Sequence, residues 1–164
     1  MSQRKAKRLS QTVLPVPAAS AVAKTVKLHL TVGKAVEAVR TLAQFATYDL
    51  PHERGFSVEW SRLKFAISRT FAALCAEPCI IAGEKAHNEA IAHNALTDST
   101  GKKMTGVWPH QPEAWAAFLA EWTPVAAQEM DITIPPLPAC IQNYCPPGVV
   151  PNQLVSLLPF IGEE

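Results

Sequence analysis

The four cysteines are the residues whose chemistry would be easiest to recognise, because thiolates bind zinc. Three residues separate Cys75 from Cys79, and four separate Cys140 from Cys145. Zinc sites usually use tighter pairs in knuckles with glycine nearby. Cytosolic thiols stay reduced, so we expect four free thiols, with Cys75 in the core of a helix, and no bound metal.

His87, Glu89 and His93 form a second group with the residue types of a metalloenzyme. A zincin helix carries two histidines four residues apart with a glutamate between them. Here the histidines are six residues apart, and on a helix this spacing rotates them away from each other. Glu89 and His93 do share a helix face, so we expect a surface ion pair worth roughly a few tenths of a kcal/mol.

The sequence lacks the short motifs that position a nucleophile or a phosphate group. It contains no Gly-x-Ser-x-Gly string and no Gly-x4-Gly-Lys-Ser/Thr string. Asp98-Ser-Thr-Gly101 is similar to the aspartic-protease triplet, but that triplet needs a β-rich scaffold and a second copy. We expect a turn there instead. We therefore predict no catalytic residue, no cofactor and no enzymatic activity.

Charge is divided unevenly along the chain. Seven cations and no carboxylate precede Glu37, so the first 36 residues carry a charge of +7 and the remaining 128 carry −6. Nothing in residues 1–24 repeats with the period of a helix, which predicts an extended arm. The clustered cations of this arm are Arg4, Lys5, Lys7 and Arg8.

The basic arm indicates a negatively charged partner, and three interpretations stay open. It could lie on the acidic body of a neighbouring subunit, neutralise the phosphates of a nucleic acid, or be a solvated tail. No aromatic residue lies among the four cations, so base stacking on the arm is not indicated. Trp108, beside a turn, is expected to be exposed and completes the predicted partner-binding residues.

The length of 164 residues suits one domain with a core of its own, which we expect over residues 25–164. The hydrophobic content of 48% is that of a globular protein. No apolar run approaches the roughly twenty residues that cross a bilayer, so no membrane partner is expected.

Two segments, residues 25–32 and 129–134, alternate between apolar and polar residues as half-buried strands do. Gly33 is expected to end the first strand. The second strand, which Pro135 closes, can pair with the first near Leu28.

Helical periodicity accounts for most of the other segments. The strongest repeat starts at Val58, with Ser57 as a plausible N-cap, and Pro78 is expected to break it near Glu77. Pro124 threatens the continuity of another helix. The expected helices cover residues 34–48, 58–77, 79–94, 112–128 and 152–160, a short extended piece covers 104–108, and residues 137–150 are irregular.

These elements predict a mainly α (α+β) fold. Three to five helices form the core, joined by a small two-stranded antiparallel sheet and the extended N-terminal arm. The tryptophans other than Trp108 are expected mostly in the core.

The layout resembles small helical proteins of unknown function encoded by tailed bacteriophages. The similarity covers roughly residues 26–161 and departs from that pattern at Pro78, at Pro124 and in the basic arm. It implies a phage gene product made with the virion proteins, and it brings no catalytic residues. The segments that carry it are the alternating entry Lys27-Leu-His-Leu30, the long central helix, the turn Asp98-Ser-Thr-Gly101, the helix from Glu113-Ala-Trp115 through Trp122, the strand from Glu129 to Pro135 and the closing Leu154-x-x-Leu157-Leu158-x-x-Ile161.

The function that follows is a non-enzymatic structural or assembly component of a tailed phage particle. It would bind other virion proteins or copies of itself through its helical body and its arm. It would lie in the virion, and in the host cytoplasm during assembly. The alternative is a small phage regulator or anti-defence factor whose arm binds nucleic acid, or which binds a host protein.

Overall fold

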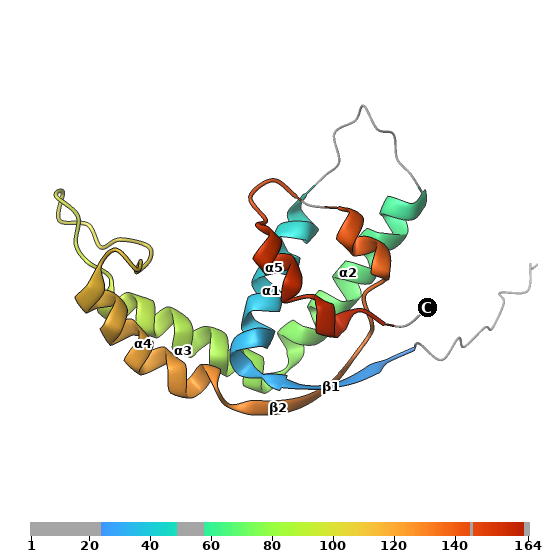
Figure 1. Cartoon of the computed structure of the whole chain (residues 1–164), viewed down its shortest axis with the longest axis horizontal. Coiled ribbons are helices and arrows are strands. Elements are labelled where there is room, and N and C mark those ends of the chain that lie inside the picture. Colours follow the sequence, from blue (N-terminus) through green and yellow to red (C-terminus); the bar gives the residue numbers. More distant parts are fainter. Residues whose placement is uncertain (1–23, 49–57, 145, 163–164) are drawn as a thin grey trace, which may run out of the picture.

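The computed structural model describes residues 24–48, 58–144 and 146–162. Within these ranges the chain forms five α-helices and one two-stranded antiparallel sheet (Figure 1). This confirms the mainly α fold with a small sheet that the sequence predicts. In chain order the elements are β1 (Val26–Thr31), α1 (Val32–Thr47), α2 (Val58–Ala76), α3 (Pro78–Asn94), α4 (Pro112–Ala126), β2 (Glu129–Ile134), the 3₁₀ helix η2 (Ala139–Asn143), α5 (Pro151–Val155) and the 3₁₀ helix η3 (Leu158–Phe160).

The strand β1 passes into α1 without a loop. Thr31 is the N-cap, and its side-chain oxygen accepts a hydrogen bond from the Lys34 amide at 3.4 Å. The prediction that Gly33 ends the strand is wrong, because the helix begins at Val32. Gly33 lies in the first turn of α1, where a Cβ atom would come within 2.9 Å of the Ala126 Cβ at the end of α4. Glycine therefore serves close helix packing here.

The predicted pairing of the two strands is confirmed. Leu28 lies opposite Ile132, and the register runs from Val26 opposite Ile134 to Thr31 opposite Glu129. Alternation of side chains puts Leu30 and Ile132 on the buried face and leaves the other face to solvent. Two strands alone are marginal in water, so the helices behind this sheet stabilise it.

The core lies around α1, which contributes more buried residues than any other described helix. Leu42 and Phe45 of α1 are completely buried. Leu63 and Ile67 of α2 are each only 1% exposed. Phe160 of η3 is also fully buried, so the last described segment closes the same core. One contiguous cluster joins the sheet, α1, α2 and the C-terminal segments.

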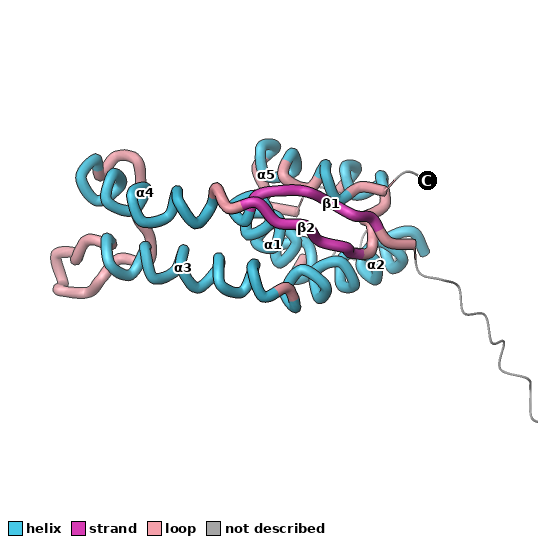
Figure 2. Tube along the Cα trace, turned by 90° about the horizontal axis from the view of Figure 1, so that it is seen from below, coloured by secondary structure: helices cyan, strands magenta, loops and turns pink. Residues whose placement is uncertain are grey.

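Pro78 divides the long central helix, as predicted. Proline lacks the amide that would continue the hydrogen bonding of α2, and it occupies the first turn of α3. The axes of α2 and α3 differ by 79°. The two views show that this bend carries α3, with α4 alongside it, away from the core as a helical hairpin (Figures 1 and 2).

Several predicted boundaries are corrected. Residues 104–108 form no strand; the nearest extended pairing is a single bridge between Thr97 and Lys103. The helix α4 continues through Pro124, because a proline so close to the C-terminus removes only one late hydrogen bond. The expected helix over residues 152–160 is divided into α5 and η3, since Pro159 cannot donate to the preceding turn.

Residues 137–150, expected to be irregular, include the short helix η2. Ser57 and the arm cations Arg4, Lys5, Lys7 and Arg8 lie outside the described residues.

We expect the Gly83→Ala variant to lose about 1–3 kcal/mol of unfolding free energy, the usual cost of overpacking a core. A Cβ atom at Gly83 would overlap the Val32 side chain and lie 3.2 Å from Cγ2 of Val36. Urea unfolding followed by circular dichroism measures the change. The direction of the change in unfolding free energy is itself the control, because glycine to alanine at an uncrowded helix position stabilises by up to about 1 kcal/mol. A stabilised variant would show that α1 and α3 are not in close contact.

Candidate functional site

The α3–α4 hairpin is the part of the described chain whose composition and burial disagree. α4 has the highest mean hydropathy of the four long helices, yet Phe118 is its only buried residue. Its only charged residues are Glu113 and Glu121. Leu119 is 37% exposed. An apolar helix that buries one side chain leaves an apolar surface in contact with water.

The large apolar residues of α4 are therefore only partly buried. Trp115 and Trp122 are half-buried, although they were expected in the core, whereas Trp60 of α2 is buried as predicted. Trp115 stacks on Phe118 with 5.4 Å between ring centroids. Trp115 and Phe118 thus form an aromatic pair within the hairpin, while Trp122 also packs against the main core.

Trp108 lies in the loop between α3 and α4 at the far end of the hairpin and is 37% exposed. This confirms the exposure predicted for it. Its ring stacks on His110 at 6.1 Å and covers Gly106, where a Cβ atom would lie 3.0 Å from the indole. The backbone amide of Gln111 donates to the backbone carbonyl of Trp108 at 2.9 Å. Local contacts therefore hold the indole in place and leave one side of it available.

The turn predicted at Asp98 is present in the same loop. One carboxylate oxygen of Asp98 accepts hydrogen bonds from the Thr100 hydroxyl at 2.6 Å, the Thr100 amide at 2.8 Å and the Lys102 amide at 3.0 Å. These bonds, the Thr100 hydroxyl first, lower the pKa of Asp98. Gly101 has a φ of +82°, which glycine adopts without strain. These three bonds explain Asp98 as a residue that stabilises the turn.

An ionic junction attaches the hairpin to the core. Arg40 of α1 forms a two-pronged pair with Glu84 of α3, Nε to Oε1 at 3.0 Å and Nη2 to Oε2 at 3.2 Å. The same guanidinium faces the ring of His87, with Nη1 3.0 Å from Nε2 and Nη2 2.9 Å from Nδ1. Arg40 can donate only to the ring nitrogen that carries no proton, so this contact favours neutral His87.

His87 also connects α3 to α4. Its ring meets Phe118 edge-on at 5.3 Å and Trp122 at 4.8 Å. Burial lowers the pKa of His87 from its ordinary value of 6.5, and the charge of Arg40 lowers it further. The charge of Glu84 raises this pKa, but its effect is smaller. The imidazole of His87 on α3 therefore contacts two other helices, α1 and α4, at the point where the hairpin leaves the core.

The predicted ion pair between Glu89 and His93 is wrong. Glu89 pairs with Lys85 at 3.7 Å, while His93 reaches across to Glu121 of α4 at 3.1 Å. Asn94 donates to the same carboxylate at 2.9 Å, and its bond and that of His93 lower the pKa of Glu121. The neighbouring helix offers a partner that spacing within α3 could not indicate.

The cysteines do not assemble a site within the described ranges. Cys75 and Cys79 are exposed free thiols, Cys140 is half-buried, and Cys145 is not among the described residues. The expected core position of Cys75 is therefore wrong; partial burial, with Glu84 nearby, still raises the pKa of its thiol. Residues 24–48, 58–144 and 146–162 contain no group of three His, Cys, Asp or Glu residues that could hold a metal ion.

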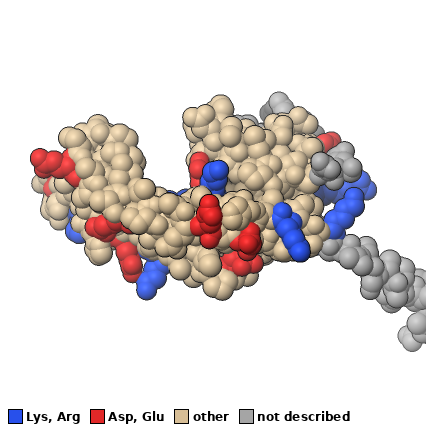
Figure 3. Space-filling model, turned by 60° about the horizontal axis from the view of Figure 1, so that its bottom comes forward, with Lys and Arg blue, Asp and Glu red and all other residues tan. Residues whose placement is uncertain are grey.

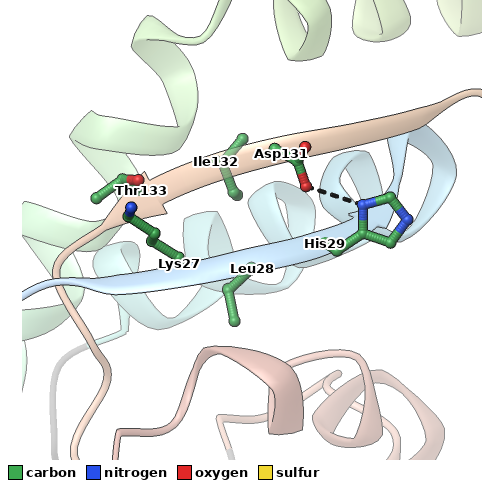
Figure 4. A pocket seen from close by; sticks show the side chains of 6 residues that line it. All are labelled: Lys27, Leu28, His29, Asp131, Ile132 and Thr133. Carbon is green, nitrogen blue, oxygen red and sulfur yellow. Dashed lines mark hydrogen bonds and ion pairs between the residues drawn. The ribbon is translucent and has the colours of Figure 1, made fainter.

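The outer face of the sheet forms a shallow open pocket of about 420 Å³ (Figure 4). Nδ1 of His29 donates a hydrogen bond to the Asp131 carboxylate opposite it at 2.8 Å, and Nε2 lies 3.5 Å from Glu129. The hydrogen bond and charge of Asp131, and then Glu129, raise the pKa of His29. Lys27 lies next to Thr133 toward the other end of the face.

Comparison with protein-family models, with curated proteins and with solved structures finds no match to the chain. Among the described helices, none is by itself long and apolar enough to cross a membrane; α2 and α3 reach that length and composition only as a bent pair.

The two histidines predict opposite responses to pH. A lowered pKa means that folded His87 binds fewer protons than the unfolded chain, so the free energy of unfolding falls as the pH drops below about 6.5. A raised pKa means that His29 stabilises the fold below 6.5, and this contribution is lost as the pH rises through the raised value.

We expect His87→Gln to weaken the loss of stability between about pH 7.5 and 5.5, and His29→Gln to strengthen it. Urea unfolding at a series of pH values measures both slopes against the unsubstituted protein. A slope that stays the same or steepens in His87→Gln would show that the imidazole is not held neutral at the junction.

Proposed function

We propose that the protein is a non-enzymatic structural or assembly component that docks onto other proteins through its helical body and its basic N-terminal arm. The observation that carries this proposal is the exposed apolar surface of α4. Only Phe118 of this helix is buried. Apolar surface that the monomer leaves in water is surface that a partner can bury.

The charge distribution on the hairpin supports a protein partner. Interface centres are depleted of charge and enriched in aromatic residues. From Ala114 to Ala120 the helix α4 carries no charged residue, and the exposed Trp108 lies at the end of the same hairpin. A surface of this kind suits burial against another protein better than contact with phosphates.

The attachment of the hairpin supports docking in a defined orientation. The Arg40–Glu84 pair and the His87 contacts fix α3 and α4 against α1. A surface held in place before binding loses little conformational entropy when the partner arrives. The docking geometry would then follow from the 79° bend between α2 and α3.

The resemblance to small helical proteins of tailed phages supports a phage particle as the setting. On this proposal the partners are other virion proteins or copies of the same chain. The protein lies in the virion, and in the host cytoplasm while particles assemble. The arm cations Arg4, Lys5, Lys7 and Arg8 add charge-complementary contacts to a neighbouring subunit.

We expect the chain to be present in purified particles, and Leu119→Glu to lower its incorporation roughly tenfold or more, because an interface would have to bury the new carboxylate. The substitution should change the unfolding free energy by less than about 0.5 kcal/mol, since Leu119 is partly exposed and glutamate suits a helix. Quantitative mass spectrometry of particles measures incorporation.

Val155→Glu is the matched control, because Val155 is a 59% exposed apolar residue on α5, in the main body of the molecule away from the hairpin (Figure 1). It should be incorporated like the unsubstituted chain. Absence of the chain from particles, or equal incorporation of Leu119→Glu, would refute docking through the hairpin.

The alternative function is a small phage regulator or anti-defence factor that binds nucleic acid or a host protein. The cations of the arm, continued by the exposed Lys24 and Lys27 at the start of the described chain, favour the nucleic-acid form of it. Phosphate binding by such a cluster releases counterions and is blind to sequence.

A salt titration of DNA binding by the full-length chain separates the two functions. If the arm binds phosphates, the logarithm of the affinity falls by roughly 0.9 per phosphate contact for each tenfold rise in salt, and removal of residues 1–8 abolishes binding. We expect no such binding. Steep salt dependence that disappears with residues 1–8 would favour the regulator over the assembly component.

A further inference from the structure

The two-stranded sheet has an unpaired edge on each side. The Val32 amide donates to the Gln128 carbonyl at 2.8 Å, and this fixes which pairs of the antiparallel ladder exchange hydrogen bonds. Bonded and non-bonded pairs alternate, so Leu30 and Leu28 bond to β2. The backbone groups of Lys27, His29 and Thr31 therefore point away from β2, and those of Glu129, Asp131 and Thr133 point away from β1.

No backbone hydrogen bond outside the helices and strands of the described residues uses the outward groups of Lys27, His29, Glu129, Asp131 or Thr133. Thr31 is the N-cap of α1, so its carbonyl belongs to the first turn of that helix. The flanking side chains are open to solvent, at 63% for His29, 72% for Glu129 and 87% for Asp131. A row of free N–H and C=O groups with accessible flanks is a template for a further strand. The structure thus offers two places where β pairing can continue.

The two edges differ in charge. The β1 edge carries Lys27 and His29, with Lys24 just before it, and the β2 edge carries Glu129 and Asp131. Figure 3 shows several blue side chains at the right of the molecule, and red ones over its middle and its left end. Two β1 edges or two β2 edges therefore repel each other, whereas a β1 edge attracts a β2 edge.

We propose that the β1 edge of one copy of this chain binds the β2 edge of a second copy in antiparallel orientation. Lys27 then lies opposite Asp131 of the second copy, and His29 lies opposite its Glu129. This pairing rests on the proposed assembly function and names copies of the same chain as one of its partners. It joins the two sheets into one four-stranded sheet.

Charge selects this pairing over the two symmetric ones. Pairing of two β2 edges would place the carboxylates of Glu129 and Asp131 opposite those of the second copy. Pairing of two β1 edges would place Lys27 near Lys27 of the second copy. Like charges directly opposite each other destabilise a strand pair. A contact between unlike edges is heterologous, so each added copy leaves one edge of each kind free. Such contacts close into a ring or grow as an open series.

The exposed charges make the contact sensitive to salt. Charges in water are screened beyond about 10 Å at 0.1 M ionic strength, so association should weaken as salt is added. A six-residue strand is also a short interface, which places one isolated contact among weak, concentration-dependent associations.

Sedimentation velocity of the full-length protein at low salt tests the proposal. We expect oligomers to grow with concentration up to about 1 mM, where weak contacts are populated, and each of Lys27→Glu and Asp131→Lys to weaken association about tenfold or more. An equimolar mixture of the two variants, or both substitutions in one chain, should restore it, since the reversed edges again attract. Lys27 lies opposite Thr133 within its own chain, so its reversal breaks no ion pair shown within the described residues.

A protein that stays monomeric throughout this range overturns the proposal. So does an Asp131→Lys variant that associates more strongly by itself, because that result indicates pairing of like edges. Thermal unfolding of each variant shows whether it is folded.

Thr133→Pro tests the backbone hydrogen bonds without changing charge. The Thr133 amide points outward, so proline removes a donor that the intramolecular ladder does not use, and association should weaken. Thr133→Ala keeps the amide and should associate normally. Equal association of the two folded variants overturns the proposal; if Thr133→Pro does not fold, the charge-reversal pair decides.

Failure here differs from failure of the proposed function. Monomeric protein that is still incorporated into particles, with incorporation lost in Leu119→Glu, refutes edge pairing and leaves hairpin docking intact. Salt-sensitive oligomers of a chain absent from particles support edge pairing and refute the particle setting.

Discussion

The close packing of the N-terminal part of α1 against α3 and α4 fixes where the hairpin lies. Val32 and Val36 lie against Gly83 of α3, and Gly33 lies against Ala126 of α4. Protein interiors are packed so densely that adding or removing a single methylene group changes stability. The absence of two Cβ atoms therefore sets how closely the hairpin approaches α1. The sheet is tied to the same contact, because β1 passes directly into α1 and β2 begins three residues after the last residue of α4.

This packing separates two tasks within one small chain. The core around Leu42 and Phe45 needs α1, α2, the buried face of the sheet and the C-terminal segments. It does not need the outer half of the hairpin, where burial is sparse. Apolar side chains in such a segment contribute little to folding of the monomer, which leaves them for contacts with other molecules.

Electrostatics has different roles in the two parts. At the junction, Arg40 is enclosed enough for its pair with Glu84 and its contact with His87 to define an orientation. On the sheet, Lys27, Glu129 and Asp131 lie in water, where individual pairs are weak. There the arrangement of charge contributes less to stability than to the choice among possible strand pairings.

The sequence by itself determined the elements and several of their ends. The alternation around Leu28 and from residue 129 to residue 134 was enough to identify both strands and their pairing. Pro78 was enough to divide the central helix, because its ring and missing amide act locally. The turn at Asp98 and the exposure of Trp108 were also local consequences of short-range chemistry. Gly33 was misassigned because a glycine that breaks a strand and one that admits a neighbouring helix look alike in sequence.

Only the tertiary structure decided which side chains meet. Arg40 and His87 are 47 residues apart, and the periodicity of either helix says nothing about that distance. His93 bonds to Glu121 instead of Glu89 because α4 lies alongside α3. α4 stays largely exposed despite its apolar composition, because the bend at Pro78 carries it beyond the core. Local patterns set which conformation each segment prefers, whereas contacts between distant segments depend on how all of them fill space together.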